Sequence, residues 1–72
     1  DIKSLFRLGL IYEEGKGVEQ NYTKAIEYYE KAAKLDDIKS LFTLGLIYEE
    51  GKGVEQNYTK AIEYLEKAAK LG

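Results

Sequence analysis

The 72-residue sequence contains no cysteine and no histidine. Without cysteine the chain forms neither a disulfide bond nor a thiolate metal site. Without histidine it also lacks the usual imidazole metal ligand and the side chain that most often acts as a general base at neutral pH. These absences exclude the common zinc, iron and copper sites, so the sequence predicts no metal, no cofactor and no enzymatic activity.

Long apolar runs and an excess of charge of one sign are also missing. No stretch approaches the roughly 20 apolar residues of a membrane span, and no secretory signal is present. The 11 basic and 13 acidic residues are interspersed and give a formal net charge of −2, whereas a nucleic-acid-binding surface needs clustered positive charge. We therefore expect a soluble chain with neither nucleic acid nor a membrane as partner.

Proline is absent as well, and the chain consists of two copies of one unit. Residues 1–36 align without gaps on residues 37–72. The units differ at three positions only, which are Arg7 against Thr43, Tyr29 against Leu65, and Asp36 against Gly72. A period of 36 residues accommodates two helices and two short connections. The sequence thus predicts an all-α fold in which residues 1–72 form a single domain of two repeats and four helices, an α-α superhelix.

The first helix of each unit is expected over residues 2–14 and 38–50. Apolar residues cover most of its circumference and leave only a narrow polar stripe, so this helix must pack on several sides. Gly45 lies near the middle of the apolar arc. There a missing side chain lets a neighbouring helix come close, which offsets the roughly 1 kcal/mol that glycine costs against alanine in a helix.

The second helix of the second unit is expected over residues 58–71, with Asn57 as its N-cap. An asparagine at this position accepts a hydrogen bond from a free backbone N–H of the first turn. Apolar residues, Leu65 among them, occupy one half of the helical wheel, and charged residues occupy the other. This pattern predicts one buried face and one solvated face.

The glycine-rich loop Gly51-Lys52-Gly53-Val54 raises the question of a phosphate site. A phosphate-binding loop of nucleotide hydrolases has four residues between its glycines, then Lys and Ser or Thr, and it lies between a strand and a helix. The loop has the wrong spacing and follows a helix, so we interpret it as a turn. Gly51 is expected to end the helix in the left-handed conformation, Gly53 to reverse the chain and Val54 to close the hairpin.

The segment LGLIYEEGKGVEQNYTKAIEYYEKAA resembles the Sel-one-like repeat, a relative of the tetratricopeptide repeat. The resemblance covers the chain twice and includes the glycine pair, the set Leu44, Gly45 and Tyr48, and the run from Lys67 to Ala69. It implies a right-handed solenoid of helical hairpins that acts as an adaptor in protein complexes.

The leading functional hypothesis is a scaffold module that binds a peptide or partner helix on the concave face, which the first helices line. Lys3 and Arg7 stand one helical turn apart and are suited to a carboxylate, because arginine offers a bidentate fork. The candidate binding residues are those of the polar stripe: Lys3, Arg7 and Glu14, with Lys39, Thr43 and Glu50. The alternative is a solvated stripe without a ligand.

A second hypothesis is a building block whose only partner is its own copy. Because 33 of 36 positions match, the repeats indicate a recent duplication or an idealised sequence. The two ends of such a stack are nearly the same surfaces that pack inside it, so copies can join head to tail as a ring or filament. The residues expected at these ends are Ile2, Leu5, Phe6 and Leu65. An enzyme is the least favoured hypothesis, because pairs such as Glu13 and Glu14 read as helix-end surface charge.

Overall fold

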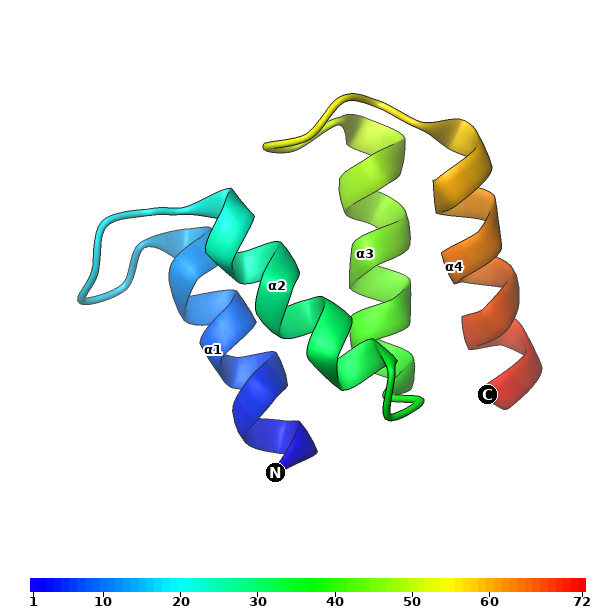
Figure 1. Ribbon diagram of the computed structural model, residues 1–72, viewed down its shortest axis with the longest axis horizontal. Helices are drawn as coiled ribbons and strands as arrows, with labels where there is room; N and C mark the ends of the chain where they lie inside the picture. The colour runs from blue at the N-terminus through cyan, green and yellow to red at the C-terminus, as the bar shows by residue number, and fades with distance from the viewer.

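The computed structural model describes all 72 residues as four α-helices without strands. They are α1 (Ile2–Glu14), α2 (Tyr22–Ala33), α3 (Ile38–Glu50) and α4 (Tyr58–Leu71). The helices stand in chain order in a layer that is thin compared with its width, with extents of 34 × 28 × 13 Å (Figure 1). Each helix packs against its neighbours in the sequence. The predicted all-α fold is confirmed, as are the predicted bounds of α1, α3 and α4.

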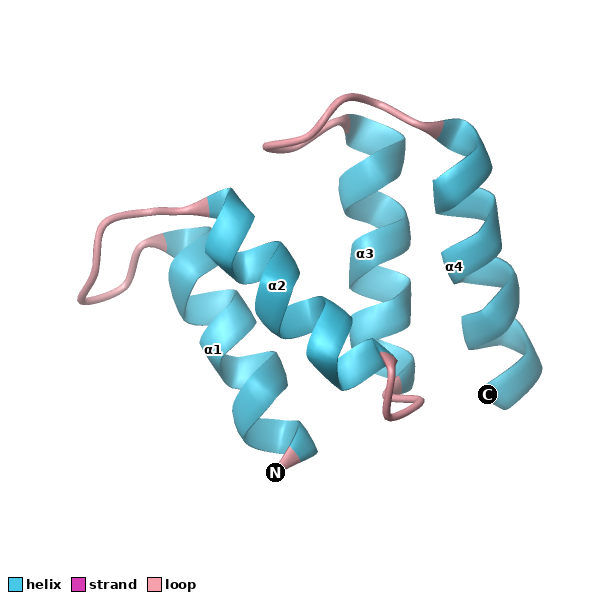
Figure 2. Ribbon diagram, viewed as in Figure 1, coloured by secondary structure: helices cyan, strands magenta, loops and turns pink.

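Two hairpins make up the layer, and their glycine-containing loops lie at the same edge of the molecule (Figure 2). The short turn between α2 and α3 lies at the opposite edge and joins the first hairpin to the second. The chain is thus a stack of two helical hairpins, as the 36-residue period predicts. No helix of the structure combines the length and the apolar character needed to cross a bilayer.

Every helix begins after an aspartate or asparagine that caps it. The side chain of Asn57 accepts a hydrogen bond from the backbone N–H of Lys60 at 3.0 Å, so the predicted cap of α4 is confirmed. Asn21 caps α2 in the same way. Asp1 and Asp37 cap α1 and α3, and neither cap was predicted. Each cap satisfies a backbone donor that the first turn of a helix leaves free.

The glycine loop is a turn, as interpreted. Gly51 ends α3 with φ 69° and donates its backbone N–H to the carbonyl of Ile47 at 2.8 Å. Gly53 also has a positive φ, 74°, a conformation that glycine adopts without steric penalty. Val54 is partly buried and packs against the core, which confirms its predicted place in the hairpin. Its counterpart Val18 is 39% exposed, because no preceding repeat lies beside it.

The glycine inside each first helix is the point of closest approach within a hairpin. A methyl group at Gly45 would lie 2.6 Å from Cγ of Leu65, and one at Gly9 would lie 2.5 Å from Cε1 of Tyr29. Neither position has room for a side chain. The prediction that Gly45 allows a neighbouring helix to come close is confirmed.

The core lies between the two hairpins and inside the second one, with α3 at its centre. α3 buries residues on several of its sides, as predicted, whereas only Gly9 is buried in the nearly identical α1. The difference arises because α3 is covered by α2 and α4, whereas α1 has α2 alone. The core residues are Ala25, Ile26, Tyr29, Ala33, Leu41, Leu44, Ile47, Tyr48, Ala61 and Ala68.

Candidate functional site

A groove of about 480 Å³ lies between α1 and the amino-terminal end of α3. It is lined by Lys3, Phe6, Arg7, Leu10, Asp37 and Lys39. The four residues from α1 stand at positions i, i+3, i+4 and i+7 and therefore share one side of that helix. The structure thus brings Lys3, Arg7 and Lys39, three of the six predicted binding residues, to one place.

The groove has an excess of positive charge. Its one carboxylate, Asp37, is already engaged, because it accepts hydrogen bonds from the backbone N–H of Ser40 at 3.0 Å and from the Ser40 hydroxyl at 2.6 Å. Lys3, Arg7 and Lys39 form no ion pair within the chain. Three cations are therefore available to an acidic partner.

Phe6 and Leu10 supply the apolar part of the groove, and both pack against the core. The ring of Phe6 lies 5.7 Å from that of Tyr29, and Nζ of Lys39 lies 6.0 Å from the centroid of Phe6. The prediction that Phe6 is exposed at an end of the stack is wrong, because this side of α1 faces the second repeat. Its counterpart Phe42, with no repeat beyond it, is 52% exposed. Leu10 was not among the predicted residues, although it follows Lys3 and Arg7 at helical spacing.

The other three predicted residues lie outside the groove and have local partners. Glu14 and Glu50 stand at the carboxyl ends of α1 and α3 and pair with the lysines of their own loops, Lys16 at 3.4 Å and Lys52 at 3.2 Å. The hydroxyl of Thr43 donates to a backbone carbonyl one turn earlier in α3, at 2.8 Å. None of the three lines the groove.

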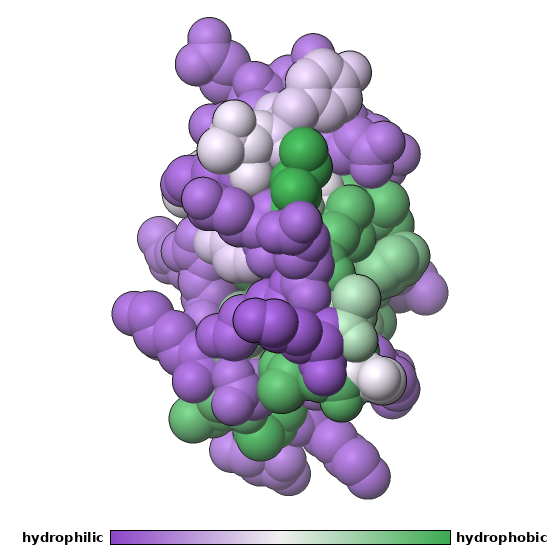
Figure 3. Space-filling view, turned by 90° about the vertical axis from the view of Figure 1, so that its right-hand side faces the viewer, coloured by the Kyte–Doolittle hydropathy of each residue, from purple (hydrophilic) through white to green (hydrophobic).

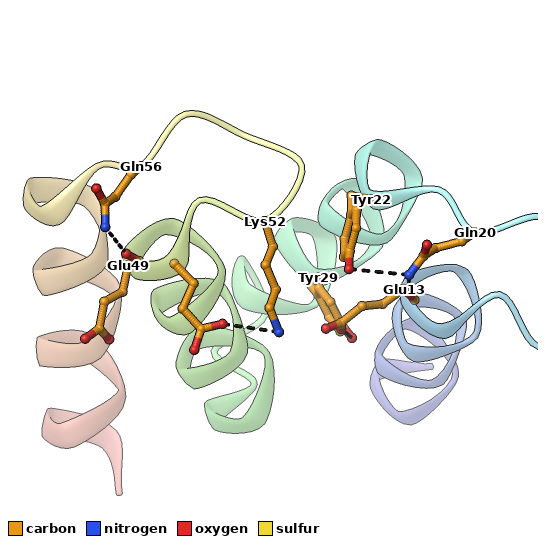
Figure 4. Close-up of polar contacts among 8 residues, drawn as sticks. Glu13, Gln20, Tyr22, Tyr29, Glu49, Lys52 and Gln56 are labelled. Atoms are coloured by element: carbon orange, nitrogen blue, oxygen red, sulfur yellow. Dashed lines mark hydrogen bonds and ion pairs between the residues drawn. The ribbon is translucent and has the colours of Figure 1, made fainter.

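Polar side chains gather near the loop edge of both repeats (Figure 4). The Tyr29 hydroxyl donates to Oε1 of Glu13 at 2.6 Å. Lys52 extends from the second loop, and its hydrogen bond and charge attraction to Glu50 raise the pKa of its amine, with smaller contributions from Tyr22 and Glu13. The lysine of the glycine loop thus interacts with carboxylates of the chain.

A second groove lies between α2 and α4 on the other side of α3, and its charges are mixed, with three lysines and two glutamates. It is lined by Glu30, Ala33, Lys34, Leu41, Lys60, Glu63, Tyr64 and Lys67. Burial, together with the nearby Glu30, raises the pKa of Tyr64 to about 12. The Tyr64 hydroxyl donates to Glu30 at 3.5 Å. The mixed charges of this groove favour no ligand of one sign.

No group of three or more acidic side chains lies close enough together to hold a metal ion. No buried side-chain nitrogen or oxygen lacks a hydrogen-bond partner either. The site is therefore a surface groove with fixed charges and an apolar floor.

A comparison with known protein families identifies the family of this chain. The Sel1 repeat family model matches residues 2–37 and again residues 38–72. The chain belongs to the Sel1 repeat family. The resemblance seen in the sequence and the two-repeat helical-hairpin solenoid are thereby confirmed. Proteins of this family generally serve as scaffolds for protein–protein interactions.

Solved structures of Sel1 repeat proteins superimpose closely on this chain. A Sel1 repeat protein from Oxalobacter formigenes has a TM-score of 0.95 at 37% identity. The protective antigen c5321 of uropathogenic Escherichia coli has a TM-score of 0.94 at 34% identity, and Helicobacter pylori cysteine rich protein B has 0.93 at 39%. Each match covers 99% of this chain, which spans 29%, 15% and 53% of the respective proteins. A comparison with curated protein sequences gives no match.

Proposed function

We propose that this Sel1 repeat chain is a binding module for an acidic peptide segment, which docks in the groove between α1 and α3. The observation that carries the proposal is the set of three unpaired cations, Lys3, Arg7 and Lys39, around one groove. Asp37 caps α3 and adds the only opposing charge. A peptide carboxylate therefore finds donors that have no partner within the chain.

The floor of the groove adds a preference for an apolar residue next to the acidic ones. Phe6 and Leu10 are partly buried side chains that still line the groove. An aliphatic or aromatic peptide side chain buries apolar surface on them, while flanking carboxylates pair with Arg7 and the two lysines. The ligand we propose is thus a short segment in which Asp or Glu residues flank one large apolar residue.

A peptide-display selection against the 72-residue chain tests this proposal. We expect the selected sequences to be rich in Asp and Glu around an apolar residue, and their binding to weaken as salt is raised. The triple variant Lys3→Ala, Arg7→Ala and Lys39→Ala should weaken binding of a selected peptide at least about tenfold, the effect of losing roughly 1.4 kcal/mol.

The matched control removes the same charge elsewhere. The control variant combines Lys31→Ala on α2, Lys34→Ala at the end of α2 and Lys70→Ala on α4. None of these three lysines lines the groove. This control should leave the affinity nearly unchanged. A selection without acidic enrichment, or an equal loss of affinity in both triple variants, would show that the groove is not the binding site.

A further inference from the structure

Identical residues in the two repeats differ sharply in exposure at the α4 end of the molecule. Ile26 is 6% exposed, whereas its counterpart Ile62 is 53% exposed. Ala33 is buried by the second repeat, and its counterpart Ala69 is exposed. We call the surface formed by Phe42, Ile62, Leu65 and Ala69 the carboxyl-end face. Figure 3 looks onto this end and shows hydrophobic residues exposed beside hydrophilic ones.

The opposite end of the molecule shows the reverse difference. In α3, the side chains of Ser40, Leu41, Leu44 and Ile47 are at most 2% exposed. Their counterparts in α1 are exposed or half-buried. We call the surface formed by these counterparts, Ser4, Leu5, Leu8 and Ile11, the amino-end face.

The interface between α2 and α3 is these two faces docked together. Inside the chain, the first-repeat counterparts of the carboxyl-end face lie against the second-repeat counterparts of the amino-end face. The four residues of the amino-end face are identical in both repeats. In the carboxyl-end face, Leu65 in place of Tyr29 is the single change, and it keeps the position apolar. Both halves of an interface that the chain already forms are therefore also present, uncovered, at its two ends.

The glycine loops repeat this complementarity. Tyr22 of the first repeat lies on Gly53, so closely that a methyl group there would collide with the Tyr22 side chain. At the open ends, the space beside Gly17 is empty, and Tyr58 is 61% exposed. Each end thus offers one half of the tyrosine-on-glycine contact that joins the repeats.

Of the residues predicted for the ends, two lie on these faces. Leu5 and Leu65 belong to the amino-end and carboxyl-end faces respectively. Ile2 is 36% exposed and its counterpart Ile38 is 41% exposed. The exposure of this position therefore does not depend on a missing neighbour, and Ile2 is not a marker of the open end.

We propose that the carboxyl-end face of one copy docks on the amino-end face of a second copy and reproduces the α2–α3 interface between molecules. The sequence identifies the partner as a second copy of this chain. The surface that covers the equivalent residues inside the chain is present again, uncovered, at the opposite end. Such a contact joins two different faces, so it extends into longer assemblies unless its rotation closes a ring. The inference is independent of any peptide in the groove.

Sedimentation velocity over a range of protein concentrations tests the inference. The mass of the 72-residue chain should rise with concentration. Ile62→Glu on one face and Ser4→Glu on the other should each raise the concentration needed for association at least about tenfold, because each places a charge in the apolar contact. Both positions are exposed in the single chain, so circular dichroism should show an unchanged fold. The control Leu35→Glu, at a 55% exposed position in the turn between α2 and α3, should associate like the parent.

Mixing the two blocked variants provides the sharper test. The Ile62→Glu chain retains an intact amino-end face, and the Ser4→Glu chain retains an intact carboxyl-end face. Their equimolar mixture should form dimers that grow no further. Ala69→Glu, at a second exposed position on the carboxyl-end face, should behave like Ile62→Glu. A chain that stays monomeric at all concentrations, or a mixture that forms no dimer, would overturn the proposal.

Discussion

Tyr29 and Leu65 occupy the same position in the two repeats, and this single difference changes how each hairpin is held together. Both side chains lie over the glycine of the preceding helix. Only Tyr29 adds a polar contact, the 2.6 Å hydrogen bond to Glu13. At this position the first hairpin is therefore joined by packing and a charge-assisted hydrogen bond, and the second by packing without a hydrogen bond.

The hydroxyl of Tyr29 should make stability depend on pH in the alkaline range. Burial, followed by the hydrogen bond to Glu13, raises the pKa of Tyr29 above its ordinary value of 10.0. Between pH 10 and that raised pKa the folded chain keeps a proton that the unfolded chain releases, so the free energy of unfolding falls as pH rises. Tyr29→Phe should lose about 1 to 3 kcal/mol at pH 7, through the missing hydrogen bond, and should show a shallower fall above pH 10.

Urea denaturation from pH 7 to pH 11 measures both effects. The control is Tyr58→Phe, at a position that is 61% exposed, and it should leave the stability at pH 7 nearly unchanged. The same alkaline slope in Tyr29→Phe and in the parent chain would show that this hydroxyl does not contribute.

Among the elements, the turn between α2 and α3 contains the only non-glycine residue with positive φ. Asp36 has φ 64°, a left-handed conformation that costs an ordinary L-residue about 1 to 2 kcal/mol. Its carboxylate lies 3.4 Å from Nζ of Lys67, and both side chains are more than half exposed. An exposed pair of this kind contributes little. The equivalent position of the second repeat is Gly72.

Replacing Asp36 by glycine should therefore stabilise the chain. We expect Asp36→Gly to raise the free energy of unfolding by about 1 kcal/mol, or Tm by roughly 4–8 °C for a domain of this size. Thermal unfolding followed by circular dichroism gives the value. Asp36→Ala removes the same ion pair but keeps a Cβ, so it should give no stabilisation. Equal Tm changes in the two variants would show that backbone conformation is not the cause.

The sequence predicted the helices well because their signals are local. Apolar periodicity, a capping Asn57 and the helix-ending Gly51 are each contained in one segment of the chain. The end of α2 is different. α2 stops at Ala33, whereas the nearly identical α4 runs to Leu71, because the chain after α2 must turn into α3. Such a boundary depends on tertiary packing, which a single segment does not contain.

The candidate site was only half predictable for the same reason. A helical wheel places Lys3, Arg7 and Glu14 on one stripe, but it does not say which part of the stripe the next repeat approaches. The structure places the contact at the amino-terminal end of α3, so Lys39 joins the groove and Glu14 does not. Phe6 was assigned to the wrong side of α1, because an almost fully apolar helix gives a weak indication of which neighbour covers which side.

At the scale of the whole molecule, two nearly identical repeats have unequal surroundings. The stack buries the surfaces that meet between the repeats. It leaves their counterparts, the carboxyl-end face and the amino-end face, uncovered at the two ends. In a solenoid each repeat contacts only its neighbours, so stability depends on the interfaces between repeats as well as on the repeats themselves. Position in the stack, and not local sequence, therefore decides which side chains stabilise the fold.

The most direct test substitutes the same residue in both repeats and compares the free energy of unfolding in urea, at protein concentrations low enough to keep the chain monomeric. Ile26 is 6% exposed and Ile62 is 53% exposed. Ile26→Ala should cost about 2 to 5 kcal/mol, since it opens a cavity in the core. Ile62→Ala should cost less than about 1 kcal/mol, since much of its side chain already contacts water. Equal losses in the two variants would contradict the stacked arrangement.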